Sequence, residues 1–161
     1  MEEIDVKFKR NKKHDSEEFK RQLKDQQDGI NELTVEEFIA NRDRYLKDGR
    51  ALEGDAAQKL ARKKALQDKI DEFREEGLSY QEAEQKANEW IKDKAALHNP
   101  DQIAGGYPEK IDGLGDLGIN SSLGSQWKNK IGELDKKIRD LAKNMTEEER
   151  KSTYLNIKLT E

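Results

Sequence analysis

The stretch that organises this chain is Leu97-His98-Asn99-Pro100-Asp101-Gln102-Ile103-Ala104-Gly105-Gly106. A long, charged run with helical spacing precedes it, and a glycine-rich segment follows it. A proline disfavours the α conformation of the residue before it, so Pro100 predicts that the incoming helix ends at or just before His98. Asn99 is then expected to cap a short helical turn, with Pro100 at its first position and the paired glycines at its end.

This arrangement places an imidazole and a carboxylate near the N-terminus of a short helix, where backbone N–H groups and the helix dipole favour an anion. A neutral imidazole is the usual side chain for taking a proton from water near pH 7. A carboxylate holds a divalent metal or orients the imidazole. The residues therefore suit phosphodiester hydrolysis, with His98 as general base or metal ligand and Asp101 as metal ligand or orienting carboxylate. On the spacing alone, local hydrogen bonding at a helix end explains the pair better.

The longer string ALHNPDQIAGG, residues 96–106, resembles the signature of the novel toxin 15 domain, also called polymorphic toxin type 15. The likeness covers most of the chain, from about Phe19 to Leu159. Further stretches are similar to that family in the same order: Gln26 to Thr34 with Asn41-Arg42, Asn120 to Trp127, and Tyr154 to Leu159. The resemblance implies that His98 and Asp101 form the catalytic pair of a bacterial DNase toxin. It also implies a divalent metal cofactor, most simply Mg²⁺.

The resemblance extends to further site residues and to partners. Gln102, Gly105 and Gly106 are expected to shape the site, and Arg42, Asn120 and Gln126 are expected to contact phosphates. The family implies a cognate immunity protein, which holds the toxin inactive in the cytoplasm of the producing cell. It also implies delivery by a bacterial secretion system, with a carrier or chaperone, and action on DNA in the target-cell cytoplasm. Two alternatives stay open: a non-enzymatic helical interaction module, and a toxin that acts on RNA or nucleotides.

The composition limits these hypotheses. The chain has 161 residues, which predicts one domain, 1–161, with a modest core. Charged residues make up 41% and hydrophobic residues 32%, and the mixed charges fall on helical faces, which indicates solvated helices rather than disorder. With a net charge of −4, nucleic-acid contacts must come from local basic patches. The absence of cysteine excludes disulfides and thiol chemistry. No apolar run is long enough to span a bilayer, and there is no signal peptide.

The periodicity predicts a mainly α-helical α+β fold with about five to six helices. Polar and apolar residues alternate over Ile4 to Phe8 and again over Leu155 to Leu159, which indicates two strands that pair with each other. Residues 1–15 should form the first strand and a basic linker at the edge of the domain. Three capping boxes begin helices at Thr34, Ser79 and Thr146.

Other helices are expected from about Asp15 to Gly29, from Asp55 to Glu76, and from the Asn120-Ser121-Ser122 cap past Leu141. The helix that begins at Ser79 should deliver His98. Gly105 to Gly124 should form a loop, in which the spacing of the aspartates does not match an EF-hand. The apolar positions of the helices are core candidates, among them Phe19, Leu23, Phe38, Tyr45, Leu46, Leu60, Leu66, Ile70, Phe73, Trp90 and Trp127.

Overall fold

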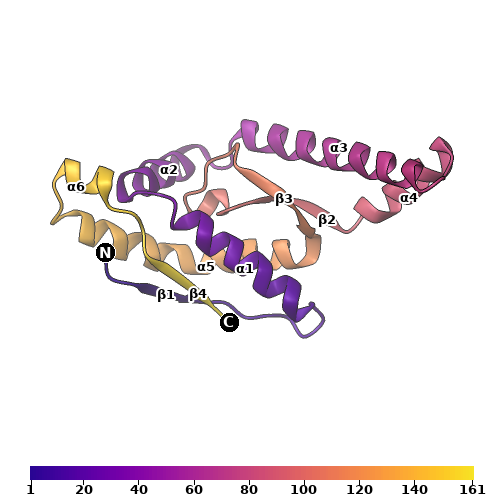
Figure 1. Ribbon diagram of the computed structural model, residues 1–161. Helices are drawn as coiled ribbons and strands as arrows, with labels where there is room; N and C mark the ends of the chain where they lie inside the picture. The colour runs from indigo at the N-terminus through magenta and orange to yellow at the C-terminus, as the bar shows by residue number, and fades with distance from the viewer.

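Six α-helices, one 3-10 turn and four short strands make up the computed structural model, which describes residues 1–161 (Figure 1). The elements in chain order are β1 (Ile4–Lys7), α1 (Ser16–Ile30), α2 (Val35–Asp48), α3 (Leu52–Glu75), α4 (Tyr80–Ile91), β2 (Lys94–His98), the 3-10 turn η1 (Gln102–Ala104), β3 (Ile111–Asp116), α5 (Leu117–Ala142), α6 (Glu147–Ser152) and β4 (Ile157–Thr160). The mainly helical α+β class predicted from the sequence is confirmed.

The first and last strands pair as the alternation predicted. β1 and β4 run parallel, with Ile4 opposite Ile157 and Val6 opposite Leu159. Their apolar side chains face the core, because every second residue of a strand points to the same side. The side-chain amide of Asn31, the residue that caps the C-terminus of α1, holds β4 in place by bonding both the N–H and the carbonyl of Ile157.

A second sheet was not predicted. β2 and β3 form an antiparallel pair, with Lys94 opposite Asp116 and Ala96 opposite Leu114. The prediction of a loop from Gly105 to Gly124 is therefore wrong, because this segment contains β3 and the first two turns of α5. The glycines of β3 obscured the alternation of polar and apolar residues that marks a strand. Gly115 is needed in β3, because a Cβ there would press on Leu97 and on two side chains of α1.

The chain reaches the central motif on a strand and not on a helix. α4 ends at Ile91, and β2 then delivers His98, so the prediction that a helix ends at His98 is wrong. Alanines 95 and 96 are compatible with either conformation, and pairing with β3 makes them a strand. The Asn99–Pro100 peptide is cis, and Asp101, not Asn99, occupies the N-cap position of the short turn.

Most helix starts follow the sequence signals. Thr34 forms a complete capping box with Glu37, and the side chains of Ser79 and Thr146 cap α4 and α6. The start of α5 differs from the prediction: Asp116 caps it by accepting the N–H of Ile119, one turn before the expected Asn120-Ser121-Ser122 cap.

The main core lies where α1, α2 and α5 pack against the β1–β4 sheet. Trp127 is fully buried there, and its ring meets Phe8 edge to face with 4.9 Å between centroids. Leu46 and Leu60 were expected in the core, but they are 64% and 70% exposed because they lie on the outer faces of their helices. No helix of the structure is apolar over a length that would cross a membrane.

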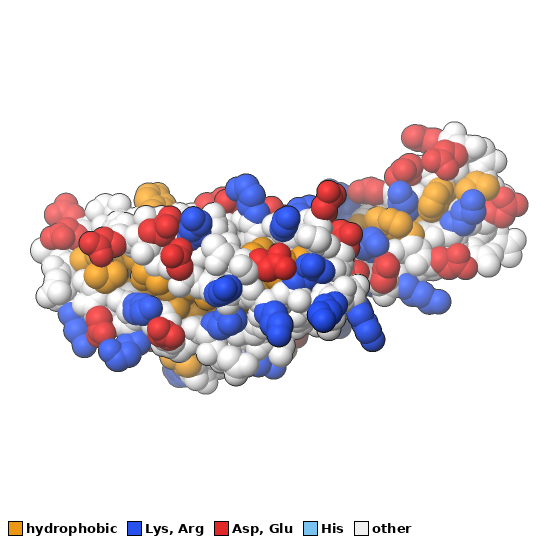
Figure 2. Space-filling model, turned by 90° about the horizontal axis from the view of Figure 1, so that it is seen from below, with side chains coloured by type: hydrophobic (Ala, Val, Ile, Leu, Met, Phe, Trp, Pro, Cys, Tyr) orange, Lys and Arg blue, Asp and Glu red, His pale blue; other side chains and the backbone are white.

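The distal part of α3 and the whole of α4 form a helical arm that projects from the body (Figures 1 and 2). The arm has its own small core of Ile70, Ala83 and Ala87, separate from the main one. On the face drawn in Figure 2, charges of both signs cover the body and a row of lysines and arginines crosses its middle. The near half of α3 faces β2 and so helps to build the site.

Candidate active site

His98 is the last residue of β2 and is 3% exposed. Its Nε2 lies 2.6 Å from the carbonyl oxygen of Pro108. A carbonyl oxygen only accepts, so Nε2 carries the proton and the lone pair of the neutral ring lies on Nδ1. Burial lowers the pKa of His98, and the Arg50 charge acts in the same sense, whereas the Pro108 carbonyl and Asp55 raise it in part. The imidazole is therefore neutral at physiological pH, with a basic nitrogen available.

Asp101 begins the turn that follows. Its backbone carbonyl accepts the N–H groups of Ala104 and Gly106, while its carboxylate makes no cap bond and faces Gly124 of α5. Burial raises the pKa of Asp101 to about 6, although Gln26 and Arg50 lower it. A carboxyl with this pKa is still mostly ionised at pH 7, but its anion is less favourable than in water, so a nearby cation would stabilise it.

A cleft of about 410 Å³ opens at this carboxylate. Two cations, Arg50 and Lys128, lie in its walls together with amide and hydroxyl groups. The Oδ1 atom of Asn120 is buried and has no hydrogen-bond partner. The cleft is lined by Tyr45, Arg50, Asp101, Gln102, Ile103, Asn120, Ser121, Gly124, Ser125 and Lys128. This combination of cations, small polar groups and one carboxylate suits a phosphate ester.

Gln26 of α1 holds the motif in shape. Its Oε1 accepts the backbone N–H of Asp101 at 3.0 Å and the indole N–H of Trp127 at 3.3 Å. Its Nε2 donates to the carbonyl of His98 at 3.1 Å. Gly29, one turn later, allows the backbone of Asn99 to pass, since a Cβ there would overlap its carbonyl. The stretch from Gln26 to Thr34, which forms part of the family resemblance, thus supports the motif through Gln26 and Gly29.

His98 and Asp101 come from one short connection, but no hydrogen bond joins them. The carbonyl of Pro108 orients the imidazole through Nε2. The carboxylate lines the cleft, whereas His98 lies behind its wall, where the charges of Arg50 and Asp55 act on it.

Three of the other expected site residues shape this region. Gly105 adopts φ +90° and packs against the ring of Phe38, and a Cβ at Gly106 would overlap the carbonyl of Pro100. The Oε1 of Gln102 accepts the N–H of Ala51 at 3.1 Å, while its Nε2 is buried without a partner. Gln102 thus joins the turn to the start of α3 and lines the cleft.

Two expected phosphate-binding residues lie elsewhere. Arg42 is buried, donates to Oδ2 of Asp135 at 2.9 Å and to the carbonyl of Ile103 at 2.7 Å, and does not reach the cleft. Gln126 bonds both backbone groups of Lys9 and so ties the N-terminal segment to α5. Sequence reasoning missed Arg50 and Lys128, which carry no motif of their own.

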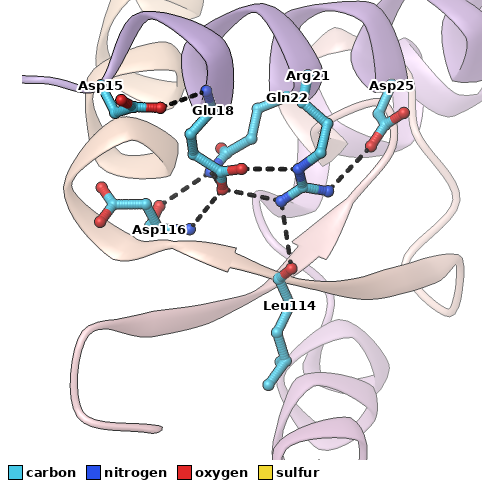
Figure 3. Close-up of polar contacts among 7 residues, drawn as sticks. All are labelled: Asp15, Glu18, Arg21, Gln22, Asp25, Leu114 and Asp116. Atoms are coloured by element: carbon cyan, nitrogen blue, oxygen red, sulfur yellow. Dashed lines mark hydrogen bonds and ion pairs between the residues drawn. The ribbon is translucent and has the colours of Figure 1, made fainter. Parts of the chain in front are cut away.

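A separate polar cluster joins α1 to the end of β3 (Figure 3). The Glu18 carboxylate accepts from Arg21, from Gln22 and from the N–H of Asp116 at 2.9 Å. These bonds, the one from Arg21 first, lower the pKa of Glu18 to about 2 despite partial burial. Arg21 also reaches the carbonyl of Leu114. The cluster satisfies its own charges and has a structural role.

The donor atoms at the cleft fit one mode of metal binding. No group of three or more His, Asp or Glu side chains converges in the structure. Mg²⁺, however, often binds through one or two carboxylates and substrate phosphates while keeping several waters. The Asp101 carboxylate and the unpartnered Asn120 Oδ1 are oxygen donors of this kind in one cleft.

The comparisons with known proteins agree with the resemblance in the sequence. A family model described as Novel toxin 15 matches residues 13–160. The match spans α1 to β4 and includes the whole cleft. No curated protein matches the chain.

Proposed function

The chain belongs to the Novel toxin 15 family, and from this premise we propose that it is a toxin nuclease that hydrolyses DNA phosphodiester bonds with the help of a divalent metal. The observation that carries the proposal is the cleft in which Asp101 lies with Arg50 and Lys128. Cations and hydrogen-bond donors aimed at a phosphate stabilise the negative charge that the phosphoryl oxygens carry in the transition state of hydrolysis.

The residues divide the work as follows. Arg50 and Lys128 bind the phosphate oxygens, and the small side chains at Gly124 and Ser125 leave room for the phosphate to approach α5. His98 lies behind the cleft wall and would act as general base through Nδ1 on a water that reaches the ring, because its other nitrogen is held by Pro108. Asp101 and Asn120 would hold Mg²⁺, which neutralises charge on the phosphate when bound.

The same premise supports the biological context. We infer that the toxin is delivered to competing bacteria by a secretion system, with a carrier or chaperone, and acts on DNA in the target-cell cytoplasm. A cognate immunity protein binds it in the producing cell and blocks the cleft. Co-expression supplies the test: the parent should kill cells when expressed alone and be harmless with its immunity protein.

Plasmid cleavage tests the chemistry. The parent protein should nick or linearise plasmid with Mg²⁺ and leave it intact with EDTA. Asp101→Asn should lower the rate at least about a hundredfold, the scale of loss typical for a catalytic group. Asp112→Asn is the matched control, because Asp112 is exposed on β3 and has no ion pair. Equal activity in the two variants would remove Asp101 from the mechanism.

His98→Gln is compared with His14→Gln, the change at the only other histidine. Since His98 is buried, circular dichroism and melting must first show that the variant is folded. Loss of cleavage in a folded His98→Gln protein supports the general base.

The alternatives give different results in the same assay. Intact plasmid at high protein concentration with every divalent metal would favour a non-enzymatic interaction module. Cleavage of RNA or a nucleotide in place of DNA would mean that the cleft is the active site but that its substrate is not DNA.

A further inference from the structure

A second cavity, of about 460 Å³, lies along β2. We call it the basic groove; it is lined by Asp55, Gln58, Lys59, Arg62, Lys92, Lys94, Ala95, Ala96 and Leu117. One wall is the first half of α3, the floor is β2, and the first residue of α5 closes the other side. Nothing in the proposed hydrolysis uses these residues.

The basic groove and the cleft share their walls. Asp55 lines the groove and pairs at 3.6 Å with Arg50, which lines the cleft. On α5, Leu117 of the groove lies one turn before Asn120 of the cleft, and on the floor β2 runs from Lys94 to His98. The two cavities therefore follow each other along one side of the molecule.

The groove holds positive charge that the protein does not neutralise. Lys59 and Lys92 have no acidic partner. The Arg62 guanidinium donates only to the backbone carbonyls of Lys94 and Ile91. These bonds fix its position but do not neutralise its positive charge. The single carboxylate in the lining, Asp55, is already paired with Arg50. This concentration contrasts with the net charge of −4 of the whole chain.

The chemistry of the lining selects the ligand. No aromatic side chain lines the groove, so bases have no surface on which to stack, and its apolar members are two alanines and a leucine. Fixed cations without base-reading groups recognise phosphates regardless of sequence. We propose that the basic groove binds the sugar-phosphate backbone of the nucleic acid on one side of the scissile phosphate; the proposal rests on the nuclease function above.

The dimensions agree with an extended backbone contact. From Leu52 to Arg62, α3 advances about 15 Å at a rise of about 1.5 Å per residue, which is the rise of roughly four base-pair steps. A substrate strand held at Asp101 thus continues past Lys59 and Lys92 before it leaves the protein.

Binding measured against salt concentration tests this groove without relying on cleavage. A fluorescent DNA duplex is titrated in EDTA with Asp101→Asn, and with the same protein carrying Lys59→Gln and Lys92→Gln. The control carries Lys136→Gln and Lys143→Gln, which remove equal charge from the far end of α5. Melting curves confirm that all three proteins are folded.

We expect the groove variant to bind about tenfold more weakly near 0.1 M salt, and its salt slope to fall by about 0.9 for each lost phosphate contact. The control should match the parent. Equal affinity and slope in the groove variant and the control would overturn the proposal. The proposal would also be overturned if the groove variant kept its affinity for DNA but lost binding to an acidic protein. If the parent cleaves plasmid but substitution of the groove lysines does not change DNA binding, the groove proposal alone is refuted. Groove-dependent binding without cleavage would refute the nuclease alone.

Discussion

The side-chain carbonyl of Gln26 accepts the backbone N–H of Asp101 at 3.0 Å across a sequence separation of 75 residues. Because the amide nitrogen of Gln26 also donates to the carbonyl of His98, one side chain spans both motif residues. The relation fixes where the carboxylate lies relative to the imidazole, although the two do not touch.

Replacing Gln26 by Leu should therefore damage both folding and activity. The change leaves buried backbone groups of His98 and Asp101 without partners, which costs about 1–3 kcal/mol for each group. Urea unfolding measures the loss, and DNA cleavage per folded molecule should fall as well. Gln67→Leu, an exposed position on the arm, should change the unfolding free energy by less than about 0.5 kcal/mol.

Arg42 should prove to be a residue of stability rather than of phosphate binding. Arg42→Ala leaves Asp135 as a buried, partly unpaired charge, and such a change typically costs about 3–5 kcal/mol. Arg44→Ala breaks an exposed pair with Glu53 and should cost at most about 1 kcal/mol. Thermal melting separates the two variants. A stable Arg42→Ala protein with weakened DNA binding would contradict this assignment.

Asp101 should make the protein less stable as the pH rises. Its pKa is raised to about 6 in the folded state, from an ordinary value of 3.8, so the folded protein holds the proton more tightly than the unfolded chain. That contribution is complete below pH 3.8 and is lost as the pH rises through about 6. Above about pH 6, Asp101→Asn should have a free energy of unfolding about 1–2 kcal/mol higher than that of the parent and should therefore melt at a higher temperature. The difference should vanish in acid. An equal gain from Asp112→Asn would refute the explanation.

Glu18 should stabilise the protein in the opposite pH range. Its pKa of about 2 lies below the ordinary 4.5, so its stabilisation is present above pH 4.5 and is lost as the pH falls through about 2. Glu18→Gln should cost about 1–3 kcal/mol near neutral pH and progressively less in acid, as measured by urea unfolding. Glu17→Gln provides the control, because Glu17 shares the first turn of α1 but belongs to no cluster.

The signals that predicted the fold were local ones. A capping box such as Thr34 with Glu37 is complete within four residues, and the alternation at Ile157 and Leu159 repeats at every second position. These features need no knowledge of distant contacts. The string of residues around His98 and Asp101 is equally local, and it carries the family resemblance by itself.

What the sequence did not show depends on distant partners. Ala95 and Ala96 favour a helix by their intrinsic propensity, and pairing with β3 overrides that preference. From the sequence, Arg42 was expected to bind phosphate. In the structure it is paired with Asp135, which lies 93 residues away in the sequence. Arg50 and Lys128 line one cleft although 78 positions separate them in the sequence, and no local pattern marks them.

The parallel pairing of β1 with β4 also bears on the order in which the protein assembles. β1 emerges first during translation, yet its partner is the last element of the fold, so the sheet cannot close until residue 157 and beyond have been made. Until then the amide of Asn31 lacks the backbone it binds, and α1, which carries Gln26, is unsupported on that side. A ribosome-bound chain therefore carries the cleft residues before β4 is present to complete the sheet that supports α1.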